Sequence, residues 1–291
     1  MKNKFAIAIS LNVVITISEV IVGFMIGSLA VISDAVHNFF DIGSMALAWW
    51  GEKVGSKQSD LSKTYGYKRA EILIALTNSL LLLFSVGVIG FESVKRFFNP
   101  QPVEGGWMLL IATIAFIGNA IATKFLHKDS DHNLNLKAAF LHSMQDALFS
   151  LGVIIGAILI LVFHIAIIDP IISIALSVFL LKEAYTLITN AVDILMESVP
   201  RGVDIGKIKT TILTLPNIEI VSDLHVWQTG SNEILLTAHI VGDIGTDQEY
   251  ATTLQAVRSV LNDTFHITHS TIQLVPKAVS AGLSDECSHC N

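Results

Sequence analysis

Two pairs of histidine and aspartate stand inside long apolar stretches of this sequence. His37 and Asp41 are four residues apart, and His142 and Asp146 repeat the same spacing. Residues four apart lie on one face of an α-helix, with their Cβ atoms about 5–6 Å from each other. Each pair therefore presents one imidazole and one carboxylate to the same point, as a chelate for a divalent metal ion requires.

The carboxylates favour a bound cation. An aspartate at the centre of a bilayer costs roughly 2.5–3.5 kcal/mol, and Asp34, Asp41 and Asp146 all fall within apolar stretches. No lysine or arginine lies within four residues of any of them to offset this cost. For His37 alone, a hydrogen-bonded histidine packed between helices is the simpler explanation, but it does not account for two matched pairs.

Two such helices together offer four ligands, enough for a tetrahedral site. If the helices run in opposite directions, His37 faces Asp146 and Asp41 faces His142. Nitrogen and carboxylate ligands in four-fold coordination suit Zn²⁺ best, with Co²⁺, Ni²⁺ or Cd²⁺ as alternatives, whereas Mg²⁺ and Ca²⁺ prefer oxygen alone. The sequence predicts a tetrahedral zinc site within the membrane.

The composition is that of a membrane protein. Hydrophobic residues make up 52% of the 291 residues and charged residues 15%, against about 25% charge in ordinary soluble domains. Mean hydropathy is +0.62. A soluble enzyme is therefore disfavoured, and a net charge of −7 offers no basic surface for nucleic acid. The two cysteines, Cys287 and Cys290, lie too near the end of the chain to organise the fold through disulfides.

Six apolar runs are long enough to cross a hydrocarbon core, which takes about 20 helical residues. They are Phe5 to Gly27, Leu29 to Trp50, Ala70 to Phe91, Trp107 to Phe125, Leu136 to Val162 and Pro170 to Ile188. The first lacks a cleavage pattern and is interpreted as a retained helix. Asp169 and Pro170 are typical of an N-cap and first-turn proline, and we expect them to begin the sixth helix.

Basic residues between the runs indicate the orientation. One side has only Lys95 and Arg96, whereas the other collects Lys2, Lys4, Lys53, Lys57, Lys63, Lys68, Arg69, Lys124, Lys128 and Lys137. Because basic residues concentrate in cytoplasmic loops, both termini are expected in the cytoplasm.

The chain after Pro200 has a different pattern. Helical spacing over Ile205 to Leu215 and Gln248 to Leu261, with strand-like runs at Ile218 to Trp227, Glu233 to Val241 and Thr268 to Val275, gives the order αββαβ. We expect three parts: a six-helix transmembrane domain over residues 1–199, a small cytosolic α+β domain over 200–280, and a Cys/His tail over 281–291.

Five segments resemble the cation diffusion facilitator family, and specifically its zinc-transporting branch. They are S-D-A-V-H-N-F-F-D (33–41), Y-G-Y-K-R-A-E (65–71), N-L-K-A-A-F-L-H-S-M-Q-D (135–146), D-P-I-I-S (169–173) and D-L-H-V-W (223–227). The resemblance implies a homodimer in the plasma (inner) membrane of a prokaryote, with a metallochaperone-like cytosolic domain. It also implies efflux of divalent cations, mainly Zn²⁺, in exchange for external protons, with His37, Asp41, His142 and Asp146 as the transport site.

Histidine ligands would supply the exchange chemistry. Imidazole binds metal only when neutral and titrates near pH 6.5, so a proton arriving at His37 or His142 competes directly with Zn²⁺. Further polar residues in the spans either line the same cavity or pack between helices; they are Asn12, Thr16, Glu19, Glu71 and Asn78.

The resemblance also points to metal sites in the cytosol. His225, His239 and His266 match positions where family members bind regulatory metal, although Val275 stands where relatives often have an acidic ligand. Ordinary surface histidines are the alternative. A separate tail site would use Cys287, His289 and Cys290, but C-x-x-C alone is short of a full zinc shell, so an empty terminus is the alternative there.

Two other functions bury zinc in a membrane. An intramembrane zinc-dependent hydrolase needs an open coordination position and a general base, and the chain has no H-E-x-x-H. A zinc-sensing membrane receptor would use the same ligands as a transporter. The sequence favours a transporter over an enzyme and leaves the receptor as an alternative.

Overall fold

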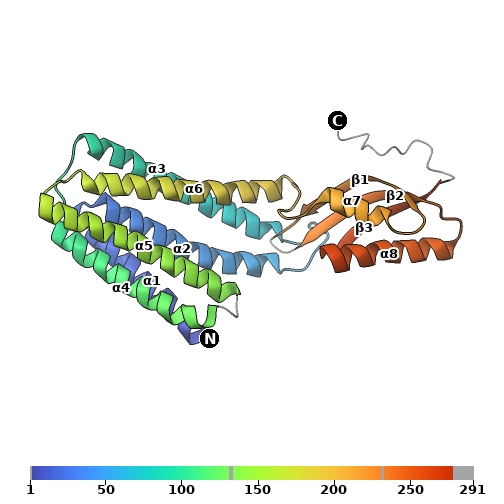
Figure 1. Ribbon diagram of the computed structural model, residues 1–291, viewed down its shortest axis with the longest axis horizontal. Coiled ribbons are helices and arrows are strands. Elements are labelled where there is room, and N and C mark those ends of the chain that lie inside the picture. The colour runs from blue at the N-terminus through green and yellow to red at the C-terminus, as the bar shows by residue number, and fades with distance from the viewer. Residues whose placement is uncertain (1, 131–133, 231–232, 278–291) are drawn as a thin grey trace. The chain divides into compact units, whose positions relative to one another are not determined.

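A computed structural model describes residues 2–130, 134–230 and 233–277 (Figure 1). The side chains of some residues within helices, that of His142 among them, also fall outside this description. The predicted tail site, Cys287, His289 and Cys290, lies outside the described residues and stays a prediction.

Six long helices come first along the chain (Figure 1). They are α1 (Lys2–Ile26), α2 (Leu29–Gly55), α3 (Arg69–Phe98), α4 (Gly105–Ser130), α5 (Leu134–Phe163) and α6 (Ile168–Leu195). Among the residues that the structure describes, α3 to α6 contain segments long and apolar enough to span a membrane, and α1 contributes a shorter apolar segment, Asn12–Ile26. The helices occupy the six apolar runs that the sequence predicts.

The helices form one compact unit over residues 1–50 and 74–188. Side chains from α2, α4, α5 and α6 share an apolar cluster that includes Val31, Met108, Ala157 and Leu176. A second cluster joins α3 to α6. The outward faces are also apolar, since Phe24, Phe84 and Phe91 are each more than 70% exposed. Apolar residues on the outside as well as the inside are what a lipid environment requires.

A buried carboxylate fixes the start of α2. Asp169 of α6 is fully buried and accepts hydrogen bonds from the Ser28 hydroxyl and from the backbone N–H groups of Leu29 (2.9 Å) and Ala30 (3.2 Å). The first amides of a helix have no partner within the helix, and Asp169 supplies one from a distant segment. The sequence predicts Asp169 as the N-cap of its own helix; the structure corrects this, because α6 already begins at Ile168 and the carboxylate caps α2 instead.

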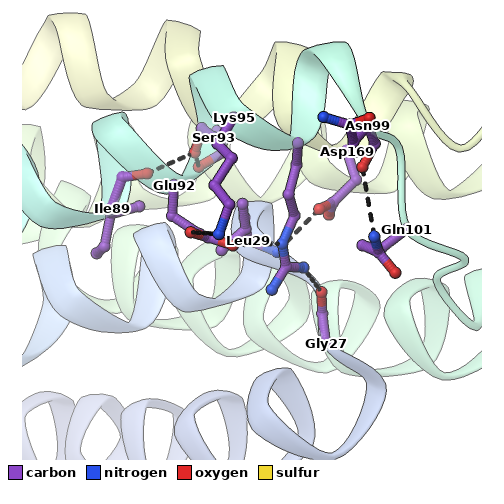
Figure 2. Close-up of polar contacts among 11 residues, drawn as sticks. Gly27, Leu29, Ile89, Glu92, Ser93, Lys95, Asn99, Gln101 and Asp169 are labelled. Atoms are coloured by element: carbon purple, nitrogen blue, oxygen red, sulfur yellow. Dashed lines mark hydrogen bonds and ion pairs between the residues drawn. The ribbon is translucent and has the colours of Figure 1, made fainter.

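The same end of the helical unit holds further polar ties between helices (Figure 2). Arg96 of α3 donates a 2.5 Å hydrogen bond to the carbonyl of Gly27, which has a positive φ of 65° in the turn between α1 and α2. Ser173 of α6 lies 2.7 Å from the hydroxyls of both Ser33 and Ser93. The position of α2 is thus set by contacts from α3 and α6.

The second unit contains residues 51–73 and 189–291, in the parts that are described. Its elements are α7 (Ile205–Leu213), β1 (Ile218–Gln228), β2 (Ile234–Gly242), α8 (Asp247–Phe265) and β3 (His269–Pro276), which confirms the predicted order αββαβ. The sheet has the order β1-β2-β3, with β1 antiparallel and β3 parallel to β2. The helices and one face of the sheet enclose a core that includes Ile208, Ile240 and Leu261.

We expect Asp169→Ala to lower the thermal unfolding midpoint of the detergent-purified protein. The change leaves the Ser28 hydroxyl and two amides of α2 without their acceptor, and hydrogen bonds to a charged group contribute about 1.5–3 kcal/mol each. Asp169→Asn keeps one acceptor oxygen and should lower the unfolding midpoint by a smaller amount. Asp263→Ala, on the exposed face of α8, is the control. Its free energy of unfolding should stay within about 0.5 kcal/mol of that of the unchanged protein, so its midpoint should hardly move. An unaltered midpoint for Asp169→Ala would contradict this role of the cap.

Candidate metal centre

Polar side chains follow one stripe of α2 into the helical unit. Asp34, His37 and Asn38 are at most 3% exposed, and Asp41 is half-buried. Spacings of three and four residues keep Asp34, His37 and Asp41 on one face of the helix. Fixing the start of α2 therefore fixes where these groups lie relative to α5.

Three of the four predicted ligands meet in the structure. His37 Nε2 lies 3.4 Å from Asp41 Oδ2 and 3.5 Å from Asp146 Oδ1. One candidate ligand atom from each residue lies within 4.8 Å of the others, the only such group of three or more found in the described part of the chain. The facing of His37 and Asp146 is as expected for α2 and α5. The side chain of His142 is outside the description, so its place opposite Asp41 stays a prediction.

The separations suit a small metal ion. In a tetrahedron with metal–ligand distances of about 2.1 Å, neighbouring ligand atoms lie about 3.4 Å apart. The contacts of His37 with Asp41 and with Asp146 have this length, which is longer than an ordinary hydrogen bond. Asp146 is only 1% exposed, so an ion between these atoms would lose most of its contact with water.

Other acidic and aromatic groups surround the three residues. Asp34 accepts a 3.4 Å hydrogen bond from the Ser150 hydroxyl, and Glu19 of α1 accepts a 2.9 Å hydrogen bond from Asn38. The ring of Phe149 packs edge-on to the His37 imidazole at 5.3 Å. Acids gathered beside one imidazole in an apolar unit favour a cation over a neutral ligand or an anion.

The additional polar residues predicted in the spans have different positions. Glu19 reaches α2 through Asn38, directly beside His37 in sequence. Thr16 is buried and donates to the carbonyl of Asn12 within α1, as polar packing requires. Asn78 of α3 is also buried. Glu71 belongs to the second unit.

The sheet carries a looser set of ligand-type residues, whose ligand atoms do not all lie within 4.8 Å of one another. Ala238 and Ile240 of β2 point into the core, so His239 between them lies on the opposite face. Asp223 Oδ1 is 3.1 Å from His225 Nε2, and its Oδ2 is 3.9 Å from His239 Nε2. A β-bulge with Asp223 at a φ of 51° brings this carboxylate between the two imidazoles.

His266 is not brought to this group. It is the C-cap of α8, three residues before His269, which pairs with Leu235 at the start of β2. His239 is four residues beyond Leu235 on β2, which places it about 13 Å along the strand from the point where His269 pairs, at 3.3 Å per residue. The binding of a regulatory metal by His225, His239 and His266, which the resemblance implies, stays a prediction. The available signal for Asp223 was its spacing of two residues from His225, which in a strand puts both on one face.

These features define an α-helical membrane protein with an acidic, histidine-containing site between its helices and a small αββαβ domain after them. Residues 5–196 match the family model of the cation efflux transmembrane domain, and residues 200–277 match that of the cytoplasmic domain of cation efflux proteins. The chain belongs to the cation efflux family, known as the cation diffusion facilitators. It is an integral membrane transporter and not an enzyme, as the sequence predicts.

Curated relatives match most of the chain. The metal cation efflux system protein CzcD of Cupriavidus metallidurans is 35% identical over 272 residues, covering 94% of this chain and 86% of that protein. A cadmium, cobalt and zinc/H⁺-K⁺ antiporter of Bacillus subtilis is 36% identical over 266 residues, covering 90% and 85%. The zinc transporter ZitB of Escherichia coli is 33% identical over 258 residues, covering 88% and 82%.

Among solved structures, the metal-bound C-terminal domain of the CzcD transporter from Cupriavidus metallidurans matches with 36% identity. It covers 25% of this chain and 99% of its own, with a TM-score of 0.23.

We expect Asp146→Asn and His37→Ala each to remove one tightly bound Zn²⁺ per chain, because each removes a ligand from the buried group. Asp34→Asn is a matched control, since Asp34 is a buried carboxylate on the same stripe but outside the group, and it should keep that ion. Equilibrium dialysis of the purified full-length protein with elemental analysis gives the counts. Equal loss in all three variants would mean that general acidity, and not this group, holds the ion.

Proposed function

We propose that this protein exports Zn²⁺ from the cytoplasm in exchange for protons, through a tetrahedral site made by His37, Asp41, His142 and Asp146. The observation that carries the proposal is the convergence of His37, Asp41 and Asp146 between α2 and α5 at separations that fit one small cation. The names of the relatives support it, since they include a zinc transporter and an antiporter of cadmium, cobalt and zinc.

The donor set favours zinc. The converging group offers one imidazole and two carboxylates, and the second imidazole, His142, is one turn before Asp146 on α5. Zn²⁺ accepts nitrogen and oxygen donors in four-fold coordination, whereas Mg²⁺ holds to octahedral oxygen shells and Ca²⁺ takes six to eight oxygen ligands. A ligand set of two neutral imidazoles and two carboxylates also balances the charge of a divalent ion.

Exchange with protons follows from the ligands themselves. A histidine that binds a proton can no longer bind metal, and imidazole titrates near pH 6.5 in water. When the site opens to a more acidic compartment, protons displace Zn²⁺; when it opens to the cytoplasm, loss of the protons restores the metal ligands. Alternating exposure of one site is sufficient for this cycle.

The cytoplasmic side is assigned from the basic residues of the loops. Ten lysines and arginines fall on the side of both termini and two on the other. We therefore place the protein in the plasma (inner) membrane of a prokaryote, with residues 1–199 as transport domain, and with 200–280 and the tail 281–291 in the cytoplasm. The small domain is proposed to join two chains into a homodimer, in line with its match to the family's cytoplasmic domain.

The sheet site is proposed to bind a regulatory Zn²⁺ through Asp223, His225 and His239. The Asp223 carboxylate lies 3.1 Å from His225 and 3.9 Å from His239, and all three groups are partly exposed, so an ion can enter from solvent and draw them together. Three protein ligands leave one position of a tetrahedron for water or for a residue of a second chain. At such a site, the cytoplasmic zinc concentration would determine whether an ion links β1 to β2.

We expect Asp41→Ala and Asp146→Ala to abolish zinc uptake by sealed vesicles that contain the purified protein, a zinc dye inside and an acidic lumen. Each variant loses a ligand of the transport site, while a correct elution volume shows that it remains folded. The unchanged protein should also release protons from the lumen, followed with a pH dye, in proportion to the zinc that enters. Near-normal flux in either variant would refute the ligand assignment, and zinc uptake without proton movement would refute the exchange.

We expect Asp223→Asn and His239→Ala to weaken zinc binding at the sheet at least tenfold, since each removes one proposed ligand, a charged carboxylate or an imidazole nitrogen. His266→Ala, a histidine of the same domain that lies away from the group, is the control and should bind normally. The measurement is isothermal titration of zinc into full-length protein. All variants also carry Asp146→Asn, which removes the transport site, so that binding at the sheet is measured separately from it. Loss of binding in His266→Ala alone would restore the three-histidine site that the sequence predicts.

A further inference from the structure

The loop between α2 and α3 folds around a single carboxylate. Asp60 accepts hydrogen bonds from the backbone N–H groups of Ser62 and Lys63, both at 2.8 Å, and from the hydroxyls of Ser62 (2.6 Å) and Tyr67 (2.7 Å). Bonds from the Ser62 and Tyr67 hydroxyls hold the pKa of Asp60 well below its usual range, so it is ionised at neutral pH. Its lone pairs are engaged within the loop.

Two lysines of this loop lie over one aromatic ring. Lys57 Nζ is 5.7 Å and Lys63 Nζ is 5.0 Å from the centre of the Tyr67 ring, which the bond to Asp60 holds in place. Contact with an aromatic face stabilises an ammonium group and limits its motion. Within the part of the chain that is described, neither of these two lysines forms an ion pair with a carboxylate.

The neighbouring basic residues are different. Lys68 pairs with Glu233 of the second unit, and Arg69 pairs with Glu197 at 2.6 Å. Partial burial acts to raise the pKa of Glu233, but hydrogen bonds from Lys68 and Thr229 outweigh it and lower the pKa. Lys68 is therefore neutralised by an ionised partner, and Lys57 and Lys63 retain the charge that the loop presents.

A polar cavity of about 500 Å³ opens beside Lys57. Its lining includes the hydroxyl-bearing Ser59 and Thr64, the Lys68 to Glu233 pair, and the imidazole of His269. His269 is held edge-on to Tyr65 at 6.1 Å between ring centres. Ammonium, hydroxyl and imidazole N–H groups are all donors, and together they suit an oxyanion such as a phosphate ester. The volume is sufficient for a lipid headgroup.

We propose that this loop binds the phosphate headgroup of an anionic phospholipid, with Lys57 and Lys63 as the cations and Tyr67 as the platform that holds them. The loop begins directly after α2 ends at Gly55 and closes where α3 begins at Arg69. Both helices belong to the matched transmembrane domain, so we place the short loop that joins them near the membrane surface. Headgroup phosphates are concentrated there, and basic residues near the membrane surface attract them.

The test uses full-length protein purified in neutral detergent, with phosphatidylglycerol and phosphatidylcholine of identical chains as probes. Native mass spectrometry counts the lipids retained from an equimolar mixture. The unchanged protein should prefer phosphatidylglycerol, and Lys57→Gln with Lys63→Gln should reduce the preference about 25-fold, because each lysine near an anionic headgroup contributes about fivefold. As the control, Lys207→Gln with Lys209→Gln removes equal charge from α7 and should leave the preference for phosphatidylglycerol unchanged.

Two further experiments test the role of the Tyr67 ring and distinguish a lipid headgroup from a soluble phosphate ester. Tyr67→Leu leaves every charge in place but removes the ring, and this variant should also lose the preference for phosphatidylglycerol. If the variant kept the preference, a disordered basic loop would be sufficient, and the proposed site would be overturned. Soluble glycerol phosphate at millimolar concentration should not displace the lipid. Displacement at that concentration would identify a free phosphate ester as the ligand and would overturn the lipid assignment.

This proposal stands apart from zinc transport. In vesicles of phosphatidylcholine alone, the Lys57→Gln and Lys63→Gln double variant should retain zinc uptake, because the transport ligands are on α2 and α5. If uptake fails in every variant while the lipid preference holds, the zinc assignment is wrong and the lipid site remains. Unchanged lipid preference in the double variant would refute the lipid site.

Discussion

Burial of acids in an apolar environment is the constraint on which this structure depends. Asp34, Asp146 and Glu19 are all at most 3% exposed within helices whose outer faces are apolar. Ionised carboxylates at such positions need a compensating positive charge, and a site without a nearby lysine or arginine obtains it from a bound cation or from protons. A protein that alternates between these two sources of charge has the basic requirements of an exchanger.

The site also requires accurate placement of one helix. His37 and Asp41 are on α2, and their partner Asp146 is on α5, so a rotation or shift of α2 would separate them. The structure holds α2 at its first residues, where Asp169 of α6 accepts from Leu29 and Ala30. A carboxylate is suited to this task because it can satisfy several amides at once and interacts favourably with the positive end of the helix dipole. The hydroxyls of Ser33 and Ser173 add a second contact one turn further along.

The second unit places charged groups by other means. In the sheet, a bulge turns Asp223 between two histidines, and in the loop after α2, Asp60 organises the backbone so that two lysines share one ring. In both cases a carboxylate with several close contacts positions groups that are exposed enough to meet a ligand. The sheet group is suited to a metal ion and the loop to an oxyanion, because the first offers acceptors and the second donors.

The sequence by itself determined the class of protein, the six membrane helices, the αββαβ order and the pairing of His37 with Asp146. The helices and the order follow from local periodicity, the class follows from composition and motifs, and the facing of His37 and Asp146 follows from the opposite directions that the basic loops give the two helices. Tertiary structure alone decided that Asp169 caps α2, since the contact joins residues about 140 positions apart. It likewise decided that Asp223 lies within 4 Å of both His225 and His239, because a bulge and a strand register depend on neighbouring strands and are not encoded in the spacing of a single one.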